Sequence, residues 1–177
     1  MAENVSIILA RGGSQGIPGK NIKNFCGKPL VAWTIEHSLS AEHIDSVWVS
    51  SDDPKILDVA AEYGAEIIWR PAQLSGNEAS SESGWLHALD HIEAAGTKVN
   101  SVVAPQCTSP VRTSADFDQA LEYFTRQKLD SLFSATLVTD FNIWKPTADG
   151  ELSSYTYDYK NRGRRQQKSD QFLENGS

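Results

Sequence analysis

Short apolar runs alternate with helical patterns along much of the chain, and this alternation limits the folds available to it. Four runs rich in Val and Ile have the length of buried strands; they cover residues 5–10, 46–50, 66–69 and 101–105. Parallel strands need long crossover connections, usually helices, and lie buried between helical layers. The sequence therefore predicts an α/β fold with a doubly wound, mostly parallel sheet flanked by helices and joined by right-handed crossovers. A fifth strand is expected at residues 131–137, and irregular chain from about residue 140.

Local signals predict three helices, two from their ends and one from an apolar face. Asp53 before Pro54 is typical of an N-cap with a first-turn proline, and Gly64 is expected to end that helix. Thr113 and Asp116 have the spacing of a capping box. The helix between the third and fourth strands is expected to bury an apolar face; this face comprises Trp85, Leu86, Leu89 and Ile92.

Length and composition predict one soluble domain covering residues 1–177. The net charge of −7 argues against a general nucleic-acid binder, which gains affinity by neutralising phosphates with Lys and Arg. Cys26 and Cys107 are far apart and match no metal-binding spacing, which fits a reducing compartment. The first residues resemble neither a secretory signal nor a membrane span, so a cytoplasmic location without membrane contact is expected.

A glycine-rich, basic loop follows the first strand, in the stretch "LARGGSQGIPGKN". Glycines let a backbone approach a ligand closely and turn its N–H groups toward an anion, while Arg11 and Lys20 add positive charge. The stretch is neither a P-loop, because Lys20 precedes Asn21, nor a dinucleotide fingerprint. Two interpretations stay open from these residues: a phosphate cradle, or a plain strand-to-helix turn.

Other polar segments follow the later strands, and in a doubly wound sheet they meet at the same edge. These segments are "SSDDP", "RPAQL" and "QCTSPVR". Taken singly, each has a simpler explanation: Arg70 as a solvated loop residue, Ser81 as a helix cap and Gln106 as a turn residue. A further run, "KNRGRRQQK", carries five basic residues in an acidic chain, a pattern usual for a solvated face or an anion-binding tail.

Several motifs in a fixed order resemble the acylneuraminate cytidylyltransferases, a branch of the CMP-sugar synthetases. They are "LARGGSQGIPGKNIKNFCGKPL", "VSSDD", "WRPAQLS", "ASSESG", "PQCTSPVR" and "RRQ…ENGS". The resemblance implies a Rossmann-like nucleotidyltransferase fold, a homodimer, and an Mg²⁺-dependent transfer of CMP from CTP to the anomeric hydroxyl of an N-acylneuraminate, with release of pyrophosphate. The synthetases for ketodeoxyoctulosonate usually carry Lys-Pro where this chain has Lys20-Asn21, which favours the acylneuraminate branch.

The resemblance also implies roles for individual residues. Catalysis would fall to Arg165, Arg164 and Lys20, and the sugar acid would meet Gln106 and Arg165. Nucleotide contacts are expected from Arg11, Gly12, Gly13, Ser14, Gly16, Lys20, Asn21, Arg70 and Ser81. An arginine that some bacterial sialate enzymes carry before the Asn-Gly pair is replaced here by Leu173 and Glu174, which leaves the sugar acid open.

No metal ligand can be assigned from the sequence. Asp52 and Asp53 form a carboxylate pair, but an N-cap explains Asp53 better. In the family the metal-binding aspartates and much of the dimer surface follow "ENGS", so we expect a shortened chain that binds CTP and turns over poorly. The alternatives are a cytidylyltransferase for legionaminate, pseudaminate or ketodeoxyoctulosonate, or a non-catalytic module that binds nucleotides or RNA.

Overall fold

The computed structural model describes residues 2–138, 142–167 and 169–176, without the side chain of Arg165. The chain forms two compact units. The first comprises Met1–Leu132 with Gly176–Ser177, and the second comprises Phe133–Asn175.

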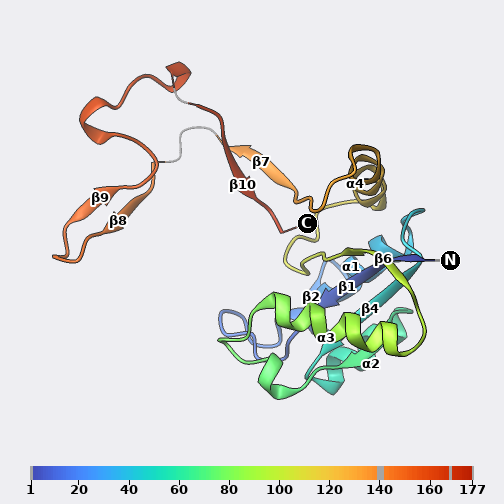
Figure 1. Ribbon diagram of the computed structural model, residues 1–177. Coiled ribbons are helices and arrows are strands. Elements are labelled where there is room, and N and C mark those ends of the chain that lie inside the picture. Colours follow the sequence, from blue (N-terminus) through green and yellow to red (C-terminus); the bar gives the residue numbers. More distant parts are fainter. Residues whose placement is uncertain (1, 139–141, 168, 177) are drawn as a thin grey trace. The chain divides into compact units, whose positions relative to one another are not determined.

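The first unit is built on a parallel sheet of four strands (Figure 1). In chain order they are β1 (Glu3–Leu9), β4 (Ser46–Ser51), β5 (Glu66–Trp69) and β6 (Val99–Val103), and in space their order is β5-β4-β1-β6. Val5 pairs with Ser46 on one side and with Val102 on the other, so β1 is a central strand. The four predicted parallel strands are confirmed, although β1 and β6 each start two residues earlier than expected.

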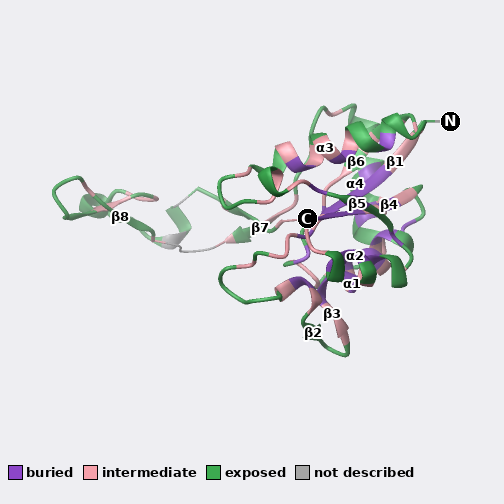
Figure 2. Ribbon diagram, turned by 90° about the horizontal axis from the view of Figure 1, so that it is seen from below, coloured by how far each residue is buried: buried purple, intermediate pink, exposed green. Residues whose placement is uncertain are grey.

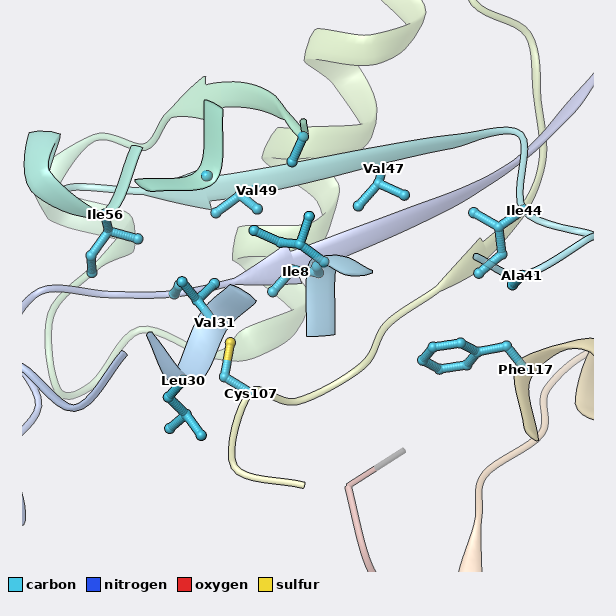
Figure 3. Close-up of a cluster of buried hydrophobic side chains, with 14 of the residues drawn as sticks. Ile8, Leu30, Val31, Ala41, Ile44, Val47, Val49, Ile56, Cys107 and Phe117 are labelled. Atoms are coloured by element: carbon cyan, nitrogen blue, oxygen red, sulfur yellow. The ribbon is translucent and has the colours of Figure 1, made fainter. Parts of the chain in front are cut away.

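Helices cover both faces of this sheet, as the doubly wound prediction requires. One core cluster joins the sheet to α1 (Leu30–Leu39), α2 (Pro54–Glu62) and α4 (Ser114–Gln127), through side chains such as Ile8, Val31 and Phe117 (Figure 3). A second cluster packs Ile92 of α3 (Ser81–Ala94) against Val5 on the opposite face. Figure 2 shows α3 on one side of the buried strands and α1 and α2 on the other.

The predicted helix caps are confirmed at both sites. The Asp53 carboxylate accepts the N–H of Lys55 at the start of α2, and Gly64 follows this helix with a φ of 88°. At the start of α4, Thr113 and Asp116 form the reciprocal capping box. These local interactions place the carboxyl ends of β4 and β6 in fixed positions relative to the helices that follow.

The predicted buried face of α3 is wrong at Leu86, which is 61% exposed. The residues that α3 buries are Gly84, Ala88 and Ile92, at intervals of four. A Cβ on Gly84 would lie 3.0 Å from Leu9 Cδ1, so the helix needs small residues where it crosses the sheet. Close helix–sheet packing therefore selects the face, and the bulkier Leu86 is turned to solvent.

Short elements complete the first unit. A 3₁₀ turn, η1 (Lys20–Ile22), precedes a hairpin of β2 (Asn24–Phe25) and β3 (Lys28–Pro29). Cys26 and Gly27 connect these strands with positive φ values of 52° and 100°, the conformation of a two-residue hairpin turn. A second turn, η2 (Ala72–Leu74), follows β5.

The second unit contains short antiparallel strands, so the expectation of irregular chain after about residue 140 is wrong. β7 (Ala135–Val138) pairs with β10 (Gln171–Glu174), and β8 (Trp144–Pro146) pairs with β9 (Leu152–Ser154). β7 starts four residues later than predicted and lies outside the parallel sheet. Two 3₁₀ turns lie between β9 and β10: η3 (Tyr159–Asn161) and η4 (Arg165–Gln167). Among the described residues, no helix is long and apolar enough to cross a membrane.

Candidate functional site

A cavity of about 410 Å³ lies in the first unit at the carboxyl ends of the parallel strands. Its wall includes Leu9 at the end of β1, Arg70 just after β5, and residues 105–108 after β6. From β1 the chain moves outward through β4 and β5, and then returns to β6 on the other side of β1. Such a reversal opens a crevice at the sheet edge, where doubly wound folds bind their ligands.

Six of the predicted site residues line this cavity together. They are Arg11, Lys20, Asn21, Arg70, Ser81 and Gln106. Three of them are cations, and no carboxylate is among the described residues that line the cavity. The wall also has an apolar part formed by Leu9, Leu74 and Trp85. This combination suits a ligand with a strongly anionic portion and a flat, less polar portion.

Arg11 reaches from the end of β1 to the loop after β5. Its Nη1 donates to the carbonyl of Gly76 at 3.1 Å and to Oδ1 of Asn77 at 3.3 Å. Both partners are neutral, so they orient the guanidinium without neutralising its charge. An anionic ligand in the cavity can therefore pair with Arg11.

The glycines of the loop that follows β1 (residues 11–21, the opening loop) have different surroundings. Gly12 donates its N–H to Asp52 Oδ1 at 3.0 Å, and a Cβ on it would lie 2.8 Å from Asp53 Cβ. Gly13 and Gly16 face open space, with nothing within 4 Å of an added Cβ. Ser14 turns back on the loop through its N–H, which donates to the Gly12 carbonyl at 2.9 Å. Gly12 is thus held by packing, whereas Gly13 and Gly16 border free space.

Lys20 and Asn21 end the loop at η1, where Gly19 adopts the left-handed conformation with a φ of 65°. Asn21 is buried, and its Nδ2 donates to the carbonyl of Arg11 at 3.0 Å. This bond closes the loop on itself across ten residues. Asn21 therefore fixes the loop, while Lys20, which is half-buried, contributes charge to the cavity wall.

Arg70 is a buried cation, only 4% exposed. Its Nε donates to Ser75 Oγ at 3.0 Å, and it forms no ion pair within the described part of the chain. Burial lowers the pKa of the Arg70 guanidinium, an effect that the nearby Asp52 carboxylate opposes and that Arg11 reinforces. Burying a charge without a partner is costly, so a buried arginine on a cavity wall points to an anionic or strongly polar ligand.

The amino end of α3 also borders the cavity. Ser80 is the N-cap, because its Oγ accepts the Ser83 N–H at 3.2 Å. Ser81 is the first residue of the helix, does not act as the cap, and lines the cavity. Gly84 lets α3 approach closely, because a Cβ there would lie 3.2 Å from Arg70 Nη1.

Gln106 follows β6 and is held by backbone interactions on two sides. Its N–H donates to the carbonyl of Gly176, at 3.0 Å, and its carbonyl accepts from Arg112 Nη2 at 3.2 Å. Gly176 adopts a φ of 74°, and a Cβ there would lie 2.7 Å from Gln106 Oε1. The glycine of "ENGS" therefore packs directly against the Gln106 side chain.

Cys107, beside Gln106, belongs to the core. Figure 3 shows its sulfur beside Leu30 and Val31, and burial raises the pKa of the thiol to about 11. At neutral pH it is therefore a protonated, apolar side chain and no nucleophile.

Sequence reasoning missed several residues of the site. Asn77 and Thr108 line the cavity. Thr108 lies within the "QCTSPVR" segment, which was the available signal, whereas Asn77 lies three residues beyond "RPAQL" and had none. Trp85 was assigned only to the core, yet it also forms part of the cavity wall. Arg112 holds the Gln106 carbonyl and donates to Thr34 Oγ1 at 2.8 Å. No pattern in the sequence indicated these long-range contacts.

The two predicted catalytic arginines lie in the second unit. Arg164 is exposed, and its N–H donates to Gln167 Oε1 at 2.9 Å. Arg165 begins η4, and its side chain lies outside the described part of the structure. Within the described residues there is also no group of three or more His, Cys, Asp or Glu side chains that could hold a metal ion.

Comparisons with known proteins agree with this architecture. A CMP:2-keto-3-deoxy-manno-octonic acid synthetase solved in complex with CTP matches with a TM-score of 0.62 at 23% identity, over 72% of this chain and 49% of that chain. The N-acylneuraminate cytidylyltransferase of Oncorhynchus mykiss is 34% identical over 174 residues, which are 97% of this chain and 39% of that protein. The pseudaminic acid cytidylyltransferase of Campylobacter jejuni is 38% identical over 135 residues, which are 76% of this chain and 58% of that protein.

The sheet order and the structural likeness define a Rossmann-like nucleotidyltransferase fold. The family model for cytidylyltransferases matches residues 5–169. The chain belongs to the cytidylyltransferase family, which confirms the resemblance found in its motifs. It spans about half the length, 39% and 58%, of the two curated relatives named above.

Proposed function

We propose that this chain carries the nucleotide site of an N-acylneuraminate cytidylyltransferase, which transfers CMP from CTP to the anomeric hydroxyl of the sugar acid. The single observation that carries this proposal is the cavity at the carboxyl ends of the parallel strands, where Arg11, Lys20 and Arg70 converge without a carboxylate among the described lining residues. A site of this charge suits a triphosphate. The identity to N-acylneuraminate cytidylyltransferases supports the choice of substrate.

In this proposal the opening loop holds the triphosphate. Arg11 and Lys20 pair with phosphate oxygens, and the open backbone at Gly13 and Gly16 leaves room for the phosphates to approach the loop amides. Asn21 and Gly12 keep the loop in place, since their bonds go to Arg11 and to Asp52. Ser14 helps to shape the loop through its bond to the Gly12 carbonyl.

The cytidine portion then lies against the opposite wall. Arg70 supplies a buried hydrogen-bond donor, and Ser81 offers a hydroxyl at the start of α3. Leu74 and Trp85 provide an apolar surface for a flat base. A base in this position would also supply a further acceptor for the buried guanidinium of Arg70, whose Nε already donates to Ser75 Oγ.

The reaction is a displacement at phosphorus. The anomeric oxygen of the sugar acid forms a bond to the α-phosphorus, the bond from this phosphorus to the bridging oxygen breaks, and pyrophosphate leaves with that oxygen and its electron pair. The hydroxyl proton leaves for solvent. Positioning and charge stabilisation supply most of the catalysis in such transfers. We assign sugar-acid contacts to Gln106 and Arg165, and charge stabilisation to Arg164, Arg165 and Lys20.

Mg²⁺ stays an expectation of the family resemblance. Mg²⁺ is usually held by one or two carboxylates together with substrate phosphates. No carboxylate lines the cavity among the residues that the structure describes, so these residues do not form a seat for the ion. None of the steps above therefore depends on a protein-bound metal.

Pseudaminate is the second candidate for the acceptor. The identity to the pseudaminic acid cytidylyltransferase is higher, 38% against 34%, although it extends over fewer residues, 135 against 174. Legionaminate and ketodeoxyoctulosonate are further acids of the same chemical class.

Pyrophosphate release tests the proposal. The chain is incubated with CTP, Mg²⁺ and each of the four sugar acids in turn, and CTP binding is measured in parallel by calorimetry. We expect CTP binding, and release with N-acetylneuraminate above the other acids. A preference for pseudaminate would move the assignment to the second candidate. Salt-sensitive RNA binding that survives saturation with CTP would instead favour a non-catalytic module.

We also infer a homodimer and a cytoplasmic location. Leu137, Phe172 and Leu173 are exposed apolar residues on the paired strands β7 and β10, which supports burial against a second copy. Sedimentation equilibrium tests the dimer, and fractionation of cells tests the location. A monomer at all concentrations up to 100-fold above that of the assay would contradict the first inference.

A further inference from the structure

We propose that Asp52 is a positioning residue that fixes the opening loop (residues 11–21) for the binding of an anionic ligand. The inference rests on the proposed function in one respect, namely that CTP is the ligand. Asp52 itself is not among the residues that line the cavity, so it acts through the loop and not by touching the ligand.

The carboxylate of Asp52 joins two neighbouring strands at their carboxyl ends. Asp52 directly follows β4, and its Oδ1 accepts the N–H of Gly12 at 3.0 Å, 40 residues earlier in the chain. Gly12 lies next to Arg11, whose guanidinium is part of the cavity wall. Holding the Gly12 amide therefore sets the direction in which the loop leaves β1 and in which Arg11 faces the cavity.

Packing leaves Gly12 little freedom at this position. An added Cβ would lie 2.8 Å from both Cβ and Oδ2 of Asp53. Asp53 is itself fixed, because its Oδ1 caps α2 through the Lys55 N–H at 2.9 Å and its own N–H donates to Ser51 Oγ at 3.1 Å. The backbone of Gly12 is thus packed against a rigid neighbour, and its N–H is tied to the Asp52 carboxylate.

The negative charge of Asp52 disfavours the binding of an anionic ligand, and its hydrogen bond to Gly12 must outweigh this effect. A negative charge near the triphosphate repels it, so electrostatics alone would favour a neutral residue at position 52. The Asp52 charge has one compensating effect, because it opposes the burial cost of the Arg70 guanidinium. Asparagine keeps an acceptor oxygen without the charge, and alanine removes both, so these substitutions separate the two effects.

The test compares Asp52→Asn and Asp52→Ala in the full 177-residue chain, with Asp58→Ala as the control. Asp58 is an exposed carboxylate on α2, so the control removes a nearby charge that does not hold the loop. We expect Asp52→Ala to weaken CTP binding about tenfold through the lost hydrogen bond, and Asp52→Asn and Asp58→Ala to stay within about twofold of the unmodified chain. The loss should be larger for CTP than for CMP, because the loop is assigned to the triphosphate and CMP carries a single phosphate.

Amide exchange of Gly12, followed by NMR, gives a readout that does not depend on activity. We expect protection of this amide in the unmodified chain and in Asp52→Asn, and at least tenfold faster exchange in Asp52→Ala. Unchanged exchange in Asp52→Ala, or a loss of CTP affinity in Asp52→Asn equal to that in Asp52→Ala, would overturn the inference. If the unmodified chain binds no CTP, the proposed function fails, whereas the exchange data still decide whether Asp52 positions the loop.

Discussion

Replacing Arg70 by methionine should change stability and ligand binding in opposite directions. Arg70 is 4% exposed, and its described hydrogen bond from Nε goes to Ser75 Oγ. Methionine fills a similar volume without the charge or the donors. If Arg70 stabilises the fold, its replacement should lower the free energy of unfolding. If it binds the ligand, its replacement should instead weaken the affinity for CTP.

The magnitudes follow from the surroundings of the side chain. Exchanging a buried charge for an apolar side chain of similar volume is often neutral or stabilising by about 1–4 kcal/mol. Loss of the hydrogen bond to Ser75 lowers the free energy of unfolding by about 0.5–1.5 kcal/mol. Ser75 keeps its own bond to the Pro71 carbonyl. We therefore expect the free energy of unfolding of Arg70→Met to be unchanged or raised by about 1–2 kcal/mol. A lost charge-assisted bond to the ligand costs about 1.5–3 kcal/mol, or about 10- to 150-fold in the Kd for CTP.

Urea denaturation and calorimetric titration with CTP measure the two quantities separately. Arg126→Met is the matched control, because Arg126 is an exposed arginine on α4. We expect this control to bind CTP like the unmodified chain and to unfold with a free energy within about 0.5 kcal/mol of it. An Arg70→Met chain whose free energy of unfolding falls by about 2 kcal/mol or more, and which still binds CTP normally, would show that Arg70 serves the fold and not the ligand.

Three further predictions concern other parts of the site. Arg11→Ala should weaken CTP binding at least tenfold in calorimetry, while Arg165→Ala should mainly raise the KM for the sugar acid; equal losses of both by either variant would contradict the assigned roles. Gly176→Ala should displace the Gln106 side chain, because its Cβ would lie 2.7 Å from Oε1 at a φ of 74°, and should lower sugar-acid affinity while leaving the Kd for CTP within about twofold. The buried Cys107 thiol, with its pKa raised to about 11, should contribute stability at neutral pH that is lost as the pH rises from the usual thiol value of 9.0 toward 11, by up to about 1.4 kcal/mol per unit.

Controls for two of these predictions come from the same chain. Gly96 has a φ of 98° and open space around an added Cβ, so Gly96→Ala tests backbone strain without the contact to Gln106; an equal loss of sugar-acid affinity in this variant would refute the steric explanation. For the thiol, urea denaturation at several pH values should show a shallower alkaline decline in Cys107→Ala than in the unmodified chain. The sign follows because the folded state binds the proton more tightly than the unfolded state over this interval. Identical declines would contradict the prediction.

The parallel sheet could be predicted because its signals are local. The apolar runs of β1, β4 and β5 and the caps at Asp53 and Thr113 depend on neighbouring residues, and all are found where they were expected. The second unit carries weaker signals, because strands of three or four residues such as β8 and β9 offer too short a pattern to show alternation. The face of α3 depends on how closely the helix crosses the sheet, which hydrophobicity alone does not indicate.

The candidate site could be predicted only in outline. Strand ends of a doubly wound sheet meet at one edge, so the convergence of Arg11, Arg70 and Gln106 on one cavity follows from topology. The topology does not indicate which loop residues contact the cavity and which hold the loop in place. Gly12 is explained by its contact with Asp53 and its bond to Asp52, which are more than thirty residues distant. Such long-range contacts are fixed by the packing of β1 beside β4, which a motif does not describe.

A crystal structure of the chain with CTP is the strongest test of the proposed nucleotide site. We expect electron density for CTP in the cavity at the carboxyl ends of the parallel strands, with the triphosphate beside Arg11 and Lys20 and the base near Arg70 and Trp85. A structure in which the cavity stays empty at saturating CTP, or in which the nucleotide binds at another surface, would contradict it.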